Sequence, residues 1–410
     1  MSAAGPRVLL VTAEYPPTPG GVGDYTARLA GALAAAGATP AVLTGQPRSF
    51  QPPRAPGDGP PVWRLAPGWG WRALPAVATA AAAWPADIVH LQYQTGAYRL
   101  HPAINLLPWW LRRRRARPAL AVTFHDTRVP YLFPRAGRLR AAANAALARG
   151  CDLTIATNPA DAAWLAPRAR RLALIPIGPN VEPDAGTGAV ATRLRAGLDL
   201  APDERLLATF GLLNHSKGLP TLLRALARLN DPAAAGRYRL ALVGAGAGGL
   251  DPTDRATAGE LRRLAAELGI AGALIWTGPL PAVEVAGWLR AADAVALPYA
   301  DGASYRRGTL LAALACGAAV VTTTPAPGAA DPAAGLPPLR SGVHVTLVPP
   351  DDPAALATAL AATAGDAWLN RALRRGACDL ARHFTWPAIA ARTLAAYRAL
   401  SNEQRATSHE

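Results

Sequence analysis

The chain contains few cysteines and no long apolar segment. Its three cysteines, Cys151, Cys316 and Cys378, are far apart and lack the spacing of metal or redox motifs, which indicates free thiols in a reducing compartment. The N-terminus has no basic segment followed by an apolar run, so we expect no signal peptide. The longest apolar stretch, residues 73–85, is too short to span a bilayer. We therefore expect a soluble, cytoplasmic protein.

Lysine is almost absent as well. Lys217 is the one lysine among 42 lysine and arginine residues. It follows an apolar stretch at 206–210, which predicts a buried strand ended by Gly211, and it precedes a predicted helix at 219–229. Such strand-to-helix loops hold phosphate in α/β proteins, and a compact ammonium on a flexible stem suits that task. We interpret Lys217 as a residue that binds an anion such as phosphate. The alternative is a solvated lysine without a function.

Acidic residues are scarce in the first half of the chain. Residues 1–180 contain 20 arginines and 7 acidic residues, which accounts for most of the net charge of +15. This imbalance predicts that the first half meets an anionic surface. Nucleic acid is not the expected partner, because the sequence shows neither interleaved aromatic and basic residues nor a helix-turn-helix pattern.

A tryptophan pair, Trp109 and Trp110, precedes the basic run Arg112–Arg115. Tryptophans settle at the level of lipid headgroups, and each basic residue near an anionic leaflet adds about 1 kcal/mol of binding free energy. One interpretation is a peripheral contact with the inner face of a membrane, which would bring the protein to a lipid-linked acceptor. Buried tryptophans beside a solvated helix end are the other.

Apolar stretches separated by helical segments recur along the chain, which is typical of parallel sheets covered on both faces. Strands are expected at 7–12, 41–43, 88–91, 120–124, 153–156 and 172–175, and then at 206–210, 239–243, 273–276, 294–297, 319–323 and 345–348. Helices are expected at 24–36, 219–229, 257–268, 282–291, 308–316 and 353–363. Proline and glycine are dense at 176–202, interpreted as a linker, and at 48–61, interpreted as a loop. Two doubly wound α/β domains are the simplest account.

Two glycine-containing loops are candidate ligand sites. Residues 244–249 match the pattern of dinucleotide-binding loops, but the glycines do not open a helix, so an ordinary glycine-rich loop is the preferred interpretation over a nicotinamide or flavin site. Residues 301–309 precede a predicted helix and include Arg306 and Arg307. Backbone N–H groups and arginines at a helix start favour an anion. A solvated helix start is the alternative there.

Several short motifs occur in one order along nearly the whole chain. They are Pro16-Pro17 with Gly20-Gly21, His125-Asp126, Gly211 with Lys217-Gly218, Thr277-Gly278, Asp293 before Leu297-Pro298, residues 311–317, and Phe384-Thr385-Trp386. Together they resemble the retaining glycosyltransferases of family 4, such as glycogen synthases and phosphatidylinositol mannosyltransferases. The resemblance implies the GT-B fold, with two facing Rossmann-like domains and a cleft between them. An acceptor-side domain is expected at 1–182, completed by a helix at about 385–400 that crosses back, and a nucleotide-sugar domain at 190–383.

The same resemblance implies transfer of a hexose from a UDP- or GDP-sugar to a glycan or a lipid-linked acceptor, without metal or cofactor. The implied catalytic residues are His125, facing the donor sugar, with Lys217 and Arg307, meeting the charge on the diphosphate. The implied donor-binding residues are Gly20, Gly21, Gly211, Asn214, Lys217, Ser304, Arg306, Arg307, Gly308 and Thr309.

Three positions depart from the family pattern. Leu212 replaces an arginine, and Ser304 and Ala312 replace a glutamate pair that meets the donor sugar and the ribose. We infer that Arg306 and Arg307 supply the charge of the missing arginine. A divergent transferase is the favoured interpretation, and a catalytically silent binding or scaffold protein is the alternative.

Overall fold

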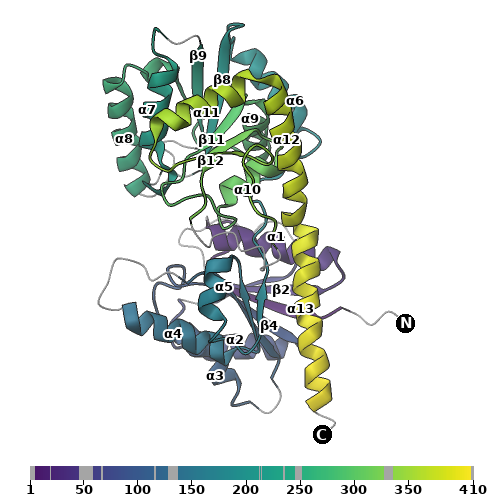
Figure 1. The fold of residues 1–410 in the computed structure, drawn as a ribbon. Helices are drawn as coiled ribbons and strands as arrows, with labels where there is room; N and C mark the ends of the chain where they lie inside the picture. The colour runs from purple at the N-terminus through teal and green to yellow at the C-terminus, as the bar shows by residue number, and fades with distance from the viewer. Residues whose placement is uncertain are drawn as a thin grey trace. The chain divides into compact units, whose positions relative to one another are not determined.

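The computed structural model describes residues 5–18, 20–45, 59–65, 68–114, 117–127, 137–211, 213, 215–233, 236–244, 252–326 and 336–407. The chain divides into two compact units (Figure 1). The first comprises Met1–Gly178 and Thr385–Glu410, and the second comprises Pro179–Phe384. The chain therefore passes from one unit to the other twice.

The first unit contains a seven-stranded parallel sheet in the order β3-β2-β1-β4-β5-β6-β7. The strands are β1 (Arg7–Thr12), β2 (Thr39–Gly45), β3 (Val62–Leu65), β4 (Ile88–Gln94), β5 (Ala119–Asp126), β6 (Leu153–Ala156) and β7 (Leu172–Leu174). The helices are α1 (Gly21–Ala35), α2 (Ala73–Ala83), α3 (Leu107–Leu111), α4 (Gly137–Gly150), α5 (Pro159–Leu165) and α13 (Trp386–Thr407).

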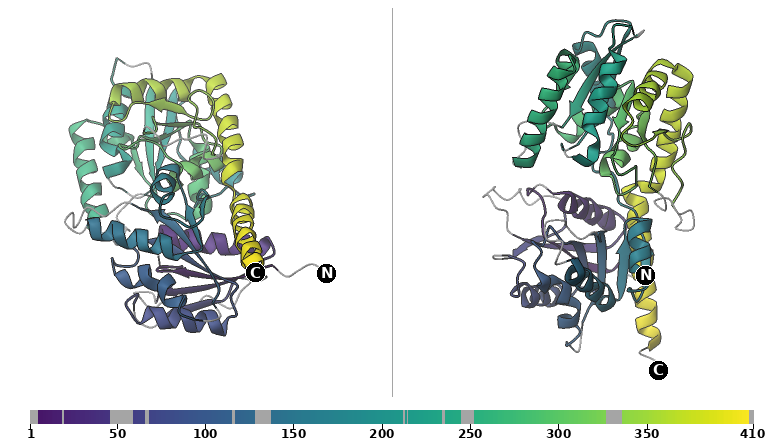
Figure 2. Two further views of the ribbon diagram at one scale, coloured as in Figure 1. Left: turned by 60° about the horizontal axis from the view of Figure 1, so that its bottom comes forward. Right: turned by 60° about the vertical axis from the view of Figure 1, so that its left-hand side comes forward.

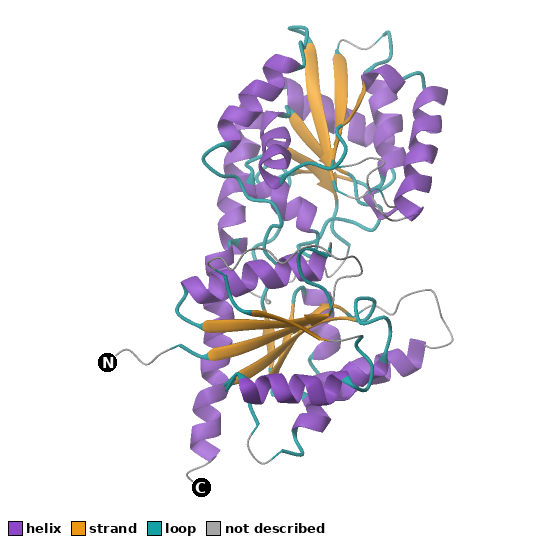
Figure 3. Ribbon diagram, turned by 180° about the vertical axis from the view of Figure 1, so that it is seen from behind, coloured by secondary structure: helices purple, strands orange, loops and turns teal. Residues whose placement is uncertain are grey.

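Alternate residues of β1 belong to two different cores, one on each face of this sheet. Val8 and Leu10 pack with residues of α1 and α13, whereas Leu9 and Val11 pack with residues of α2 and α4. This alternation follows from the period of two along a strand. Helices accordingly cover both faces of the sheet (Figure 3).

The C-terminal helix α13, yellow in Figure 2, belongs to the first unit, where it packs against α1. Trp386, Ile389 and Tyr397 on α13 are buried in the core that also contains Val8 and Leu10. A Cβ added to Gly178 would lie 2.6 Å from the Trp386 ring, so the two points where the chain changes unit are packed together.

The second unit contains a six-stranded parallel sheet in the order β10-β9-β8-β11-β12-β13. The strands are β8 (Glu204–Phe210), β9 (Arg237–Val243), β10 (Leu274–Trp276), β11 (Ala294–Leu297), β12 (Val320–Thr323) and β13 (Thr346–Val348). The helices are α6 (Thr187–Gly197), α7 (Leu219–Leu229), α8 (Pro252–Glu267), α9 (Ala282–Ala291), α10 (Gly308–Ala315), α11 (Pro353–Gly365) and α12 (Ala367–Ala381).

The predicted class of two doubly wound α/β domains is confirmed, and each predicted strand and helix has a counterpart. One expectation was wrong: the segment 176–202 is not simply a linker, because it contains α6, which packs against α9 in the second unit. Strand β3 was not predicted, nor were helices α2, α3, α4, α5 and α12. The predicted loop at 48–61 lies outside the described residues up to position 58.

The three cysteines are free, as predicted. In the parts of the chain that the structure describes, we find no helix with the length and hydropathy needed to cross a bilayer.

Candidate functional site

The order of strands in the second unit defines a switch point. From β8 the sheet grows outward through β9 and β10 on one side and through β11, β12 and β13 on the other. β8 and β11 are therefore neighbouring strands, and the loops that follow them begin at the same carboxyl edge of the sheet and lead away in opposite directions. Ligands of open α/β sheets bind at this position, outside the carboxyl ends of the strands.

Lys217 lies in the loop after β8 and contacts the loop and helix after β11. Its Nζ donates a hydrogen bond to Thr309 Oγ1 at 2.7 Å, and Thr309 Oγ1 also bonds to the Tyr299 hydroxyl at 2.7 Å. Nζ lies 5.2 Å from the centre of the buried Tyr299 ring. The lysine is thus held at the switch point by Thr309 and Tyr299.

Arg307 brings a second cation to the same aromatic ring. Its Cζ lies 4.7 Å from the centre of the Tyr299 ring, and its Nη1 donates to Ser216 Oγ at 3.1 Å. Ser216 directly precedes Lys217, so the guanidinium is joined to the lysine loop.

The negative charge beside these cations comes from Asp301. Its carboxylate pairs with Arg307 and, at 3.6 Å, with Arg306. Within the described ranges, no carboxylate forms an ion pair with Lys217. The sequence did not predict the role of Asp301, although its position before Arg306 and Arg307 was a signal.

Burial lowers the pKa of Lys217 to about 7, and the nearby charge of Arg307 acts in the same direction. Perturbed lysines in loops at the end of a sheet are candidates for functional residues. An anion bound beside Nζ would favour the charged form and raise this pKa. The site is therefore short of negative charge, as expected for a phosphate-binding site.

The start of α10 adds hydrogen-bond donors. Gly308 and Thr309 are its first residues, and no side chain caps this N-terminus. Ser304 Oγ and Arg307 Nε are buried and have no hydrogen-bond partner in the described part of the chain. Buried polar groups without partners are costly, so these atoms are suited to bonding a ligand.

Two glycines allow the close approach of the loops. Gly211 has φ 115°, and a Cβ there would lie 2.8 Å from Thr309 Cγ2 and 3.3 Å from Lys217 Nζ. Gly218 has φ 63°, and a Cβ there would lie 1.9 Å from the carbonyl oxygen of Pro298. A side chain at either position would push the lysine loop away from the loop after β11.

These contacts gather most of the predicted donor-site residues of the second unit. They are Gly211, Lys217, Ser304, Arg306, Arg307, Gly308 and Thr309. Asn214 lies outside the described residues. Ala312 is fully buried inside α10. Their roles in binding a donor stay predictions.

In the first unit, the start of α1 holds a carboxylate of the chain itself. Glu14 Oε1 accepts hydrogen bonds from the backbone N–H groups of Val22 at 3.1 Å and Gly23 at 3.4 Å. A Cβ on Gly20 would lie 2.1 Å from this oxygen, whereas a Cβ on Gly21 would meet nothing within 4 Å. Burial raises the pKa of Glu14. Gly20 therefore makes room for Glu14, which the sequence did not single out; the predicted diphosphate role of both glycines stays a prediction.

His125 lies at the end of β5, and its Nε2 is 3.0 Å from Gln92 Oε1. The Tyr25 ring meets it edge-on at 4.6 Å. His125 is partly buried, and its burial lowers the pKa of the imidazole to about 3, so the ring is neutral at neutral pH. Gln92 and His90 were missed because β4 was read as fully apolar; polar residues at alternate positions were the signal.

In the segment of tryptophans and arginines at 109–115, some side chains are exposed to solvent and others bond to the rest of the first unit. Trp109 and Trp110 on α3 are 45% and 37% exposed, and Arg113 and Arg114 are exposed. Arg112 does not point to solvent alone, because it pairs with Asp152 at 3.0 Å and bonds to the Gly150 carbonyl. Arg115 lies outside the described residues. The alternative of fully buried tryptophans is therefore wrong.

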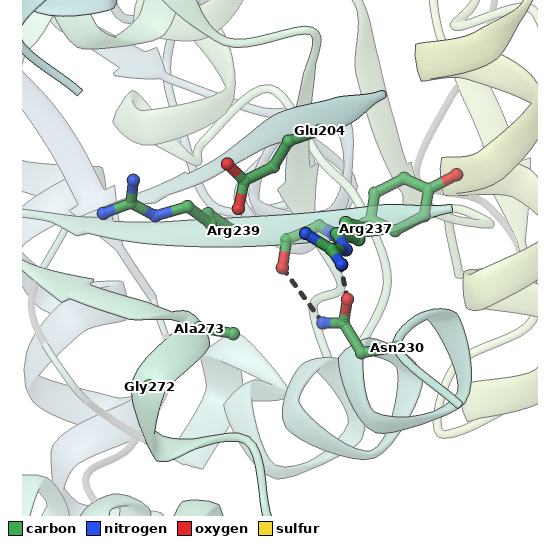
Figure 4. A pocket seen from close by; sticks show the side chains of 7 residues that line it. Glu204, Asn230, Arg237, Arg239, Gly272 and Ala273 are labelled. Carbon is green, nitrogen blue, oxygen red and sulfur yellow. Dashed lines mark hydrogen bonds between the residues drawn. The ribbon is translucent and has the colours of Figure 1, made fainter. Parts of the chain in front are cut away.

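A pocket at the amino ends of β8 and β9 lies at the opposite edge of the second sheet (Figure 4). Its polar groups bond to nearby backbone. Asn230 exchanges two hydrogen bonds with the backbone of Tyr238, and Arg239 Nη1 donates to the Leu198 carbonyl at 2.9 Å. Glu204 accepts a bond from the Ala201 N–H. These contacts account for the pocket as a structural feature.

Residues 20–178 match the family model described as Glycosyl transferase 4-like domain, and residues 204–366 match the model described as Glycosyl transferases group 1. A similar curated protein is D-inositol 3-phosphate glycosyltransferase 1 of Catenulispora acidiphila, 35% identical over 206 residues, which are 50% of this chain and 46% of that protein. Another is D-inositol 3-phosphate glycosyltransferase of Stackebrandtia nassauensis, 36% identical over 227 residues, 53% of this chain and 47% of that protein. The chain spans about half the length of the curated relatives it matches.

Among solved structures, sucrose-phosphate synthase of Thermosynechococcus elongatus has a TM-score of 0.74 at 23% identity, covering 97% of this chain and 100% of that chain. Anabaena HepE, solved in complex with UDP-glucose, has a TM-score of 0.69 at 19% identity, covering 97% and 100%. These likenesses show the fold, which is the GT-B fold of glycosyltransferases. Each half of the chain thus contains a segment that matches a glycosyltransferase family model, residues 20–178 in the first half and residues 204–366 in the second.

Proposed function

We propose that the chain is a retaining glycosyltransferase that moves a hexose from a UDP- or GDP-sugar to a glycan or a lipid-linked acceptor without a metal ion. The observation that carries the proposal is the pair of cations, Lys217 and Arg307, at the switch point of the second sheet. The family domains and the relatives that are named as glycosyltransferases support it. The HepE complexes with UDP and UDP-glucose favour uridine as the first base to test.

The chemistry of the site fits the departure of a nucleoside diphosphate. Negative charge develops on the diphosphate as its bond to the sugar breaks. Lys217 Nζ, the Arg307 guanidinium and the N–H groups at the start of α10 are donors of the kind that stabilise this charge. The unpaired Ser304 hydroxyl can bond a sugar hydroxyl in place of the glutamate of related enzymes. His125, from the first unit, is proposed to contact the sugar.

Ala312 is the observation that favours the alternative of a catalytically silent binding or scaffold protein. An apolar side chain buried in α10 offers no oxygen to a ribose. Because Lys217 and Arg307 are both in place, we favour the transferase.

The first test is a thermal-shift screen of the full chain with nucleoside diphosphates and nucleotide sugars, with and without EDTA. We expect one nucleotide family, uridine or guanosine, to raise the melting temperature equally in both conditions. Loss of the shift in EDTA would contradict the metal-independent proposal. No shift with any nucleotide would favour the scaffold alternative. The nucleotide sugars that raise the melting temperature are then tested as donors for transfer of the sugar to glycans, lipid-linked acceptors and inositol phosphate.

We further propose that the enzyme acts in the cytoplasm, at the inner face of the membrane, through the exposed residues Trp109, Trp110, Arg113 and Arg114. Replacing both tryptophans by serine is expected to lower sedimentation with anionic vesicles about 10-fold, because aromatic side chains at headgroup level and nearby arginines act together. Trp368→Ser, which removes a tryptophan that is 69% exposed in the second unit, is the control and should leave sedimentation unchanged. Equal binding of all three proteins would contradict the assignment.

A further inference from the structure

A pocket of about 570 Å³ lies in the second unit, where the C-terminal end of α10 meets α9 and α12. Among the described residues that line it, four are arginines and one is acidic: Arg290, Arg374, Arg375, Arg382 and Asp379. Helix α9 contributes Arg290, and α12 with the turn that follows it contributes the others. Two segments that are far apart in the sequence therefore place positive charge around one cavity.

This excess of positive charge is local. Residues 181–410 contain 22 lysine and arginine residues and 20 acidic residues, so the second half of the chain is nearly balanced. A pocket with four arginines and one aspartate departs from that balance. The general arginine content of the chain, which acidic residues offset in this half, does not explain the excess.

Arg374 is the most buried of the four arginines. Its guanidinium donates hydrogen bonds to uncharged groups, among them the carbonyl oxygens of Gly317 at 3.2 Å and Ala292 at 2.5 Å. Burial lowers the pKa of Arg374, and the charge of Asp293 opposes this shift. Asp293 itself pairs with Arg195, and within the described ranges no carboxylate forms an ion pair with Arg374. The guanidinium is therefore firmly held, and no bonded carboxylate cancels its charge.

The exposed arginines of the pocket have hydrogen-bond donors available. In the part of the chain that the structure describes, the side chains of Arg290 and Arg375 make no hydrogen bond or ion pair. Arg382 pairs with Asp379 at 3.5 Å, and an exposed pair of this kind contributes little to stability. A guanidinium presents its N–H groups in a planar fork that fits two oxygens of a phosphate. These side chains can therefore bind a phosphate group at little cost to the fold.

We propose that this pocket binds a small molecule through a phosphate monoester or diphosphate group, which carries about two negative charges at neutral pH. Four guanidinium groups against one carboxylate suit a ligand of that charge better than a singly charged one. The pocket is not the proposed donor site, because Gly308 and Thr309 begin α10 and the pocket lies at its other end, about 12 Å along the helix axis. The phosphate can belong to a soluble molecule or to a lipid headgroup.

Cys378 supplies a reporter of the occupied pocket. It lines the pocket and is exposed, whereas Cys151 and Cys316 are buried. A Cβ added to Gly317 would lie 2.9 Å from Cys378 Sγ, so the thiol lies against the turn that follows α10. A ligand bound between the arginines therefore shields Cys378 from a thiol reagent.

The first experiment follows the alkylation of Cys378 in the full chain by iodoacetamide, a neutral reagent, using mass spectrometry. Inorganic pyrophosphate is the probe, and sodium chloride at equal ionic strength is the reference. We expect the rate to fall about 10-fold at a pyrophosphate concentration about ten times its dissociation constant, because only empty pockets react. Vesicles of phosphatidic acid are compared with vesicles of phosphatidylcholine in parallel. Protection by pyrophosphate assigns a soluble ligand, protection by phosphatidic acid alone assigns a lipid headgroup, and protection by neither overturns the proposal.

Substitution of the exposed arginines tests whether the pocket holds the probe. In the double variant Arg375→Gln/Arg382→Gln, we expect the dissociation constant for pyrophosphate to rise about 10-fold or more, because two hydrogen bonds between charged groups are lost. Both side chains are exposed, so the fold should persist. Arg371→Gln is the matched control, since Arg371 is an exposed arginine of α12 that does not line the pocket. Equal weakening in both proteins would show an effect of overall charge and would overturn the proposal.

Lys217→Ala separates this pocket from the proposed donor site. Pyrophosphate should still protect Cys378 in this variant, because Lys217 does not line the pocket. Loss of protection would mean that pyrophosphate acts at the switch point, which contradicts the proposal. If no nucleotide stabilises the wild type while pyrophosphate still protects Cys378, the transferase function fails and the assignment of this pocket stands.

Discussion

Lys217→Ala is expected to lower the rate of sugar transfer about 10- to 100-fold and to abolish the stabilisation by nucleoside diphosphates. A hydrogen bond to a charged group contributes about 1.5–3 kcal/mol, and each 1.4 kcal/mol changes a rate about tenfold. Steady-state kinetics and thermal shifts with the nucleotide found in the screen measure the two effects. Because Thr309 and Tyr299 stay bonded to each other, the fold should survive the change.

The pH dependence of binding supplies a sharper test of the same residue. The pKa of Lys217 is about 7 without ligand, and a diphosphate raises it, so binding takes up a proton above that pH. The affinity for the nucleoside diphosphate should therefore be highest below about pH 7. It should fall as the pH rises, until the pH reaches the higher pKa that Lys217 has in the complex. In Lys217→Ala this fall should disappear.

Arg228→Ala is the control for loss of one positive charge. Arg228 is an exposed cation in the last turn of α7, the helix that follows the lysine loop. Affinity and rate should stay close to those of the wild type in this variant. If both variants lose affinity equally, the lysine acts through the overall charge and not through the site.

Gly218→Ala is expected to cause the largest loss of stability, on the order of 4 kcal/mol or more. Alanine at φ 63° costs roughly 1–2 kcal/mol by itself, because Cβ crowds the backbone in this region. Its Cβ would also lie 1.9 Å from the Pro298 carbonyl oxygen, so the loops after β8 and β11 have to separate. Differential scanning calorimetry of the full chain measures the shift in melting temperature.

Gly269→Ala measures the cost of placing alanine at a positive φ without a steric clash of its Cβ. Gly269 has φ 69°, in the same region, but a Cβ there would meet nothing within 4 Å. This variant should lose about 1–2 kcal/mol, well under the loss in Gly218→Ala. Equal losses in the two variants would mean that the loops move apart without cost and that Gly218 does not fix Lys217.

The sequence predicted the parts of the site that depend on local pattern. An apolar run followed by Gly211 and one rare lysine is sufficient to place Lys217 at the end of a strand, and the motif at 301–309 placed Arg307 at a helix start. Ser304 and Ala312 were found by comparison with the pattern of related enzymes. That the two loops meet at a switch point depends on strand order, which the sequence did not specify beyond the fold class.

The parts that were missed depend on contacts between distant segments. Gln92 and His90 are ordinary residues of a strand until β5 and α13 are packed beside it; Tyr397 is 307 positions away from His90. Glu14 gains its importance only when α1 begins beside it. Helix α6 was hidden because proline and glycine on both sides dominate the composition of 176–202. In each case the role of the residue or helix depends on tertiary contacts, which the local sequence pattern does not reveal.

The return of α13 to the first unit has a consequence for synthesis on the ribosome. The core around Val8 and Leu10 needs Trp386, Ile389 and Tyr397, which emerge after all of Pro179–Phe384. Chains usually fold from the N-terminus onward as they are made. Here the sequence of the later unit is complete first, and the part of the earlier unit's core that α13 covers stays open until α13 has been made. We therefore expect the first 178 residues to need protection from aggregation until α13 has been made.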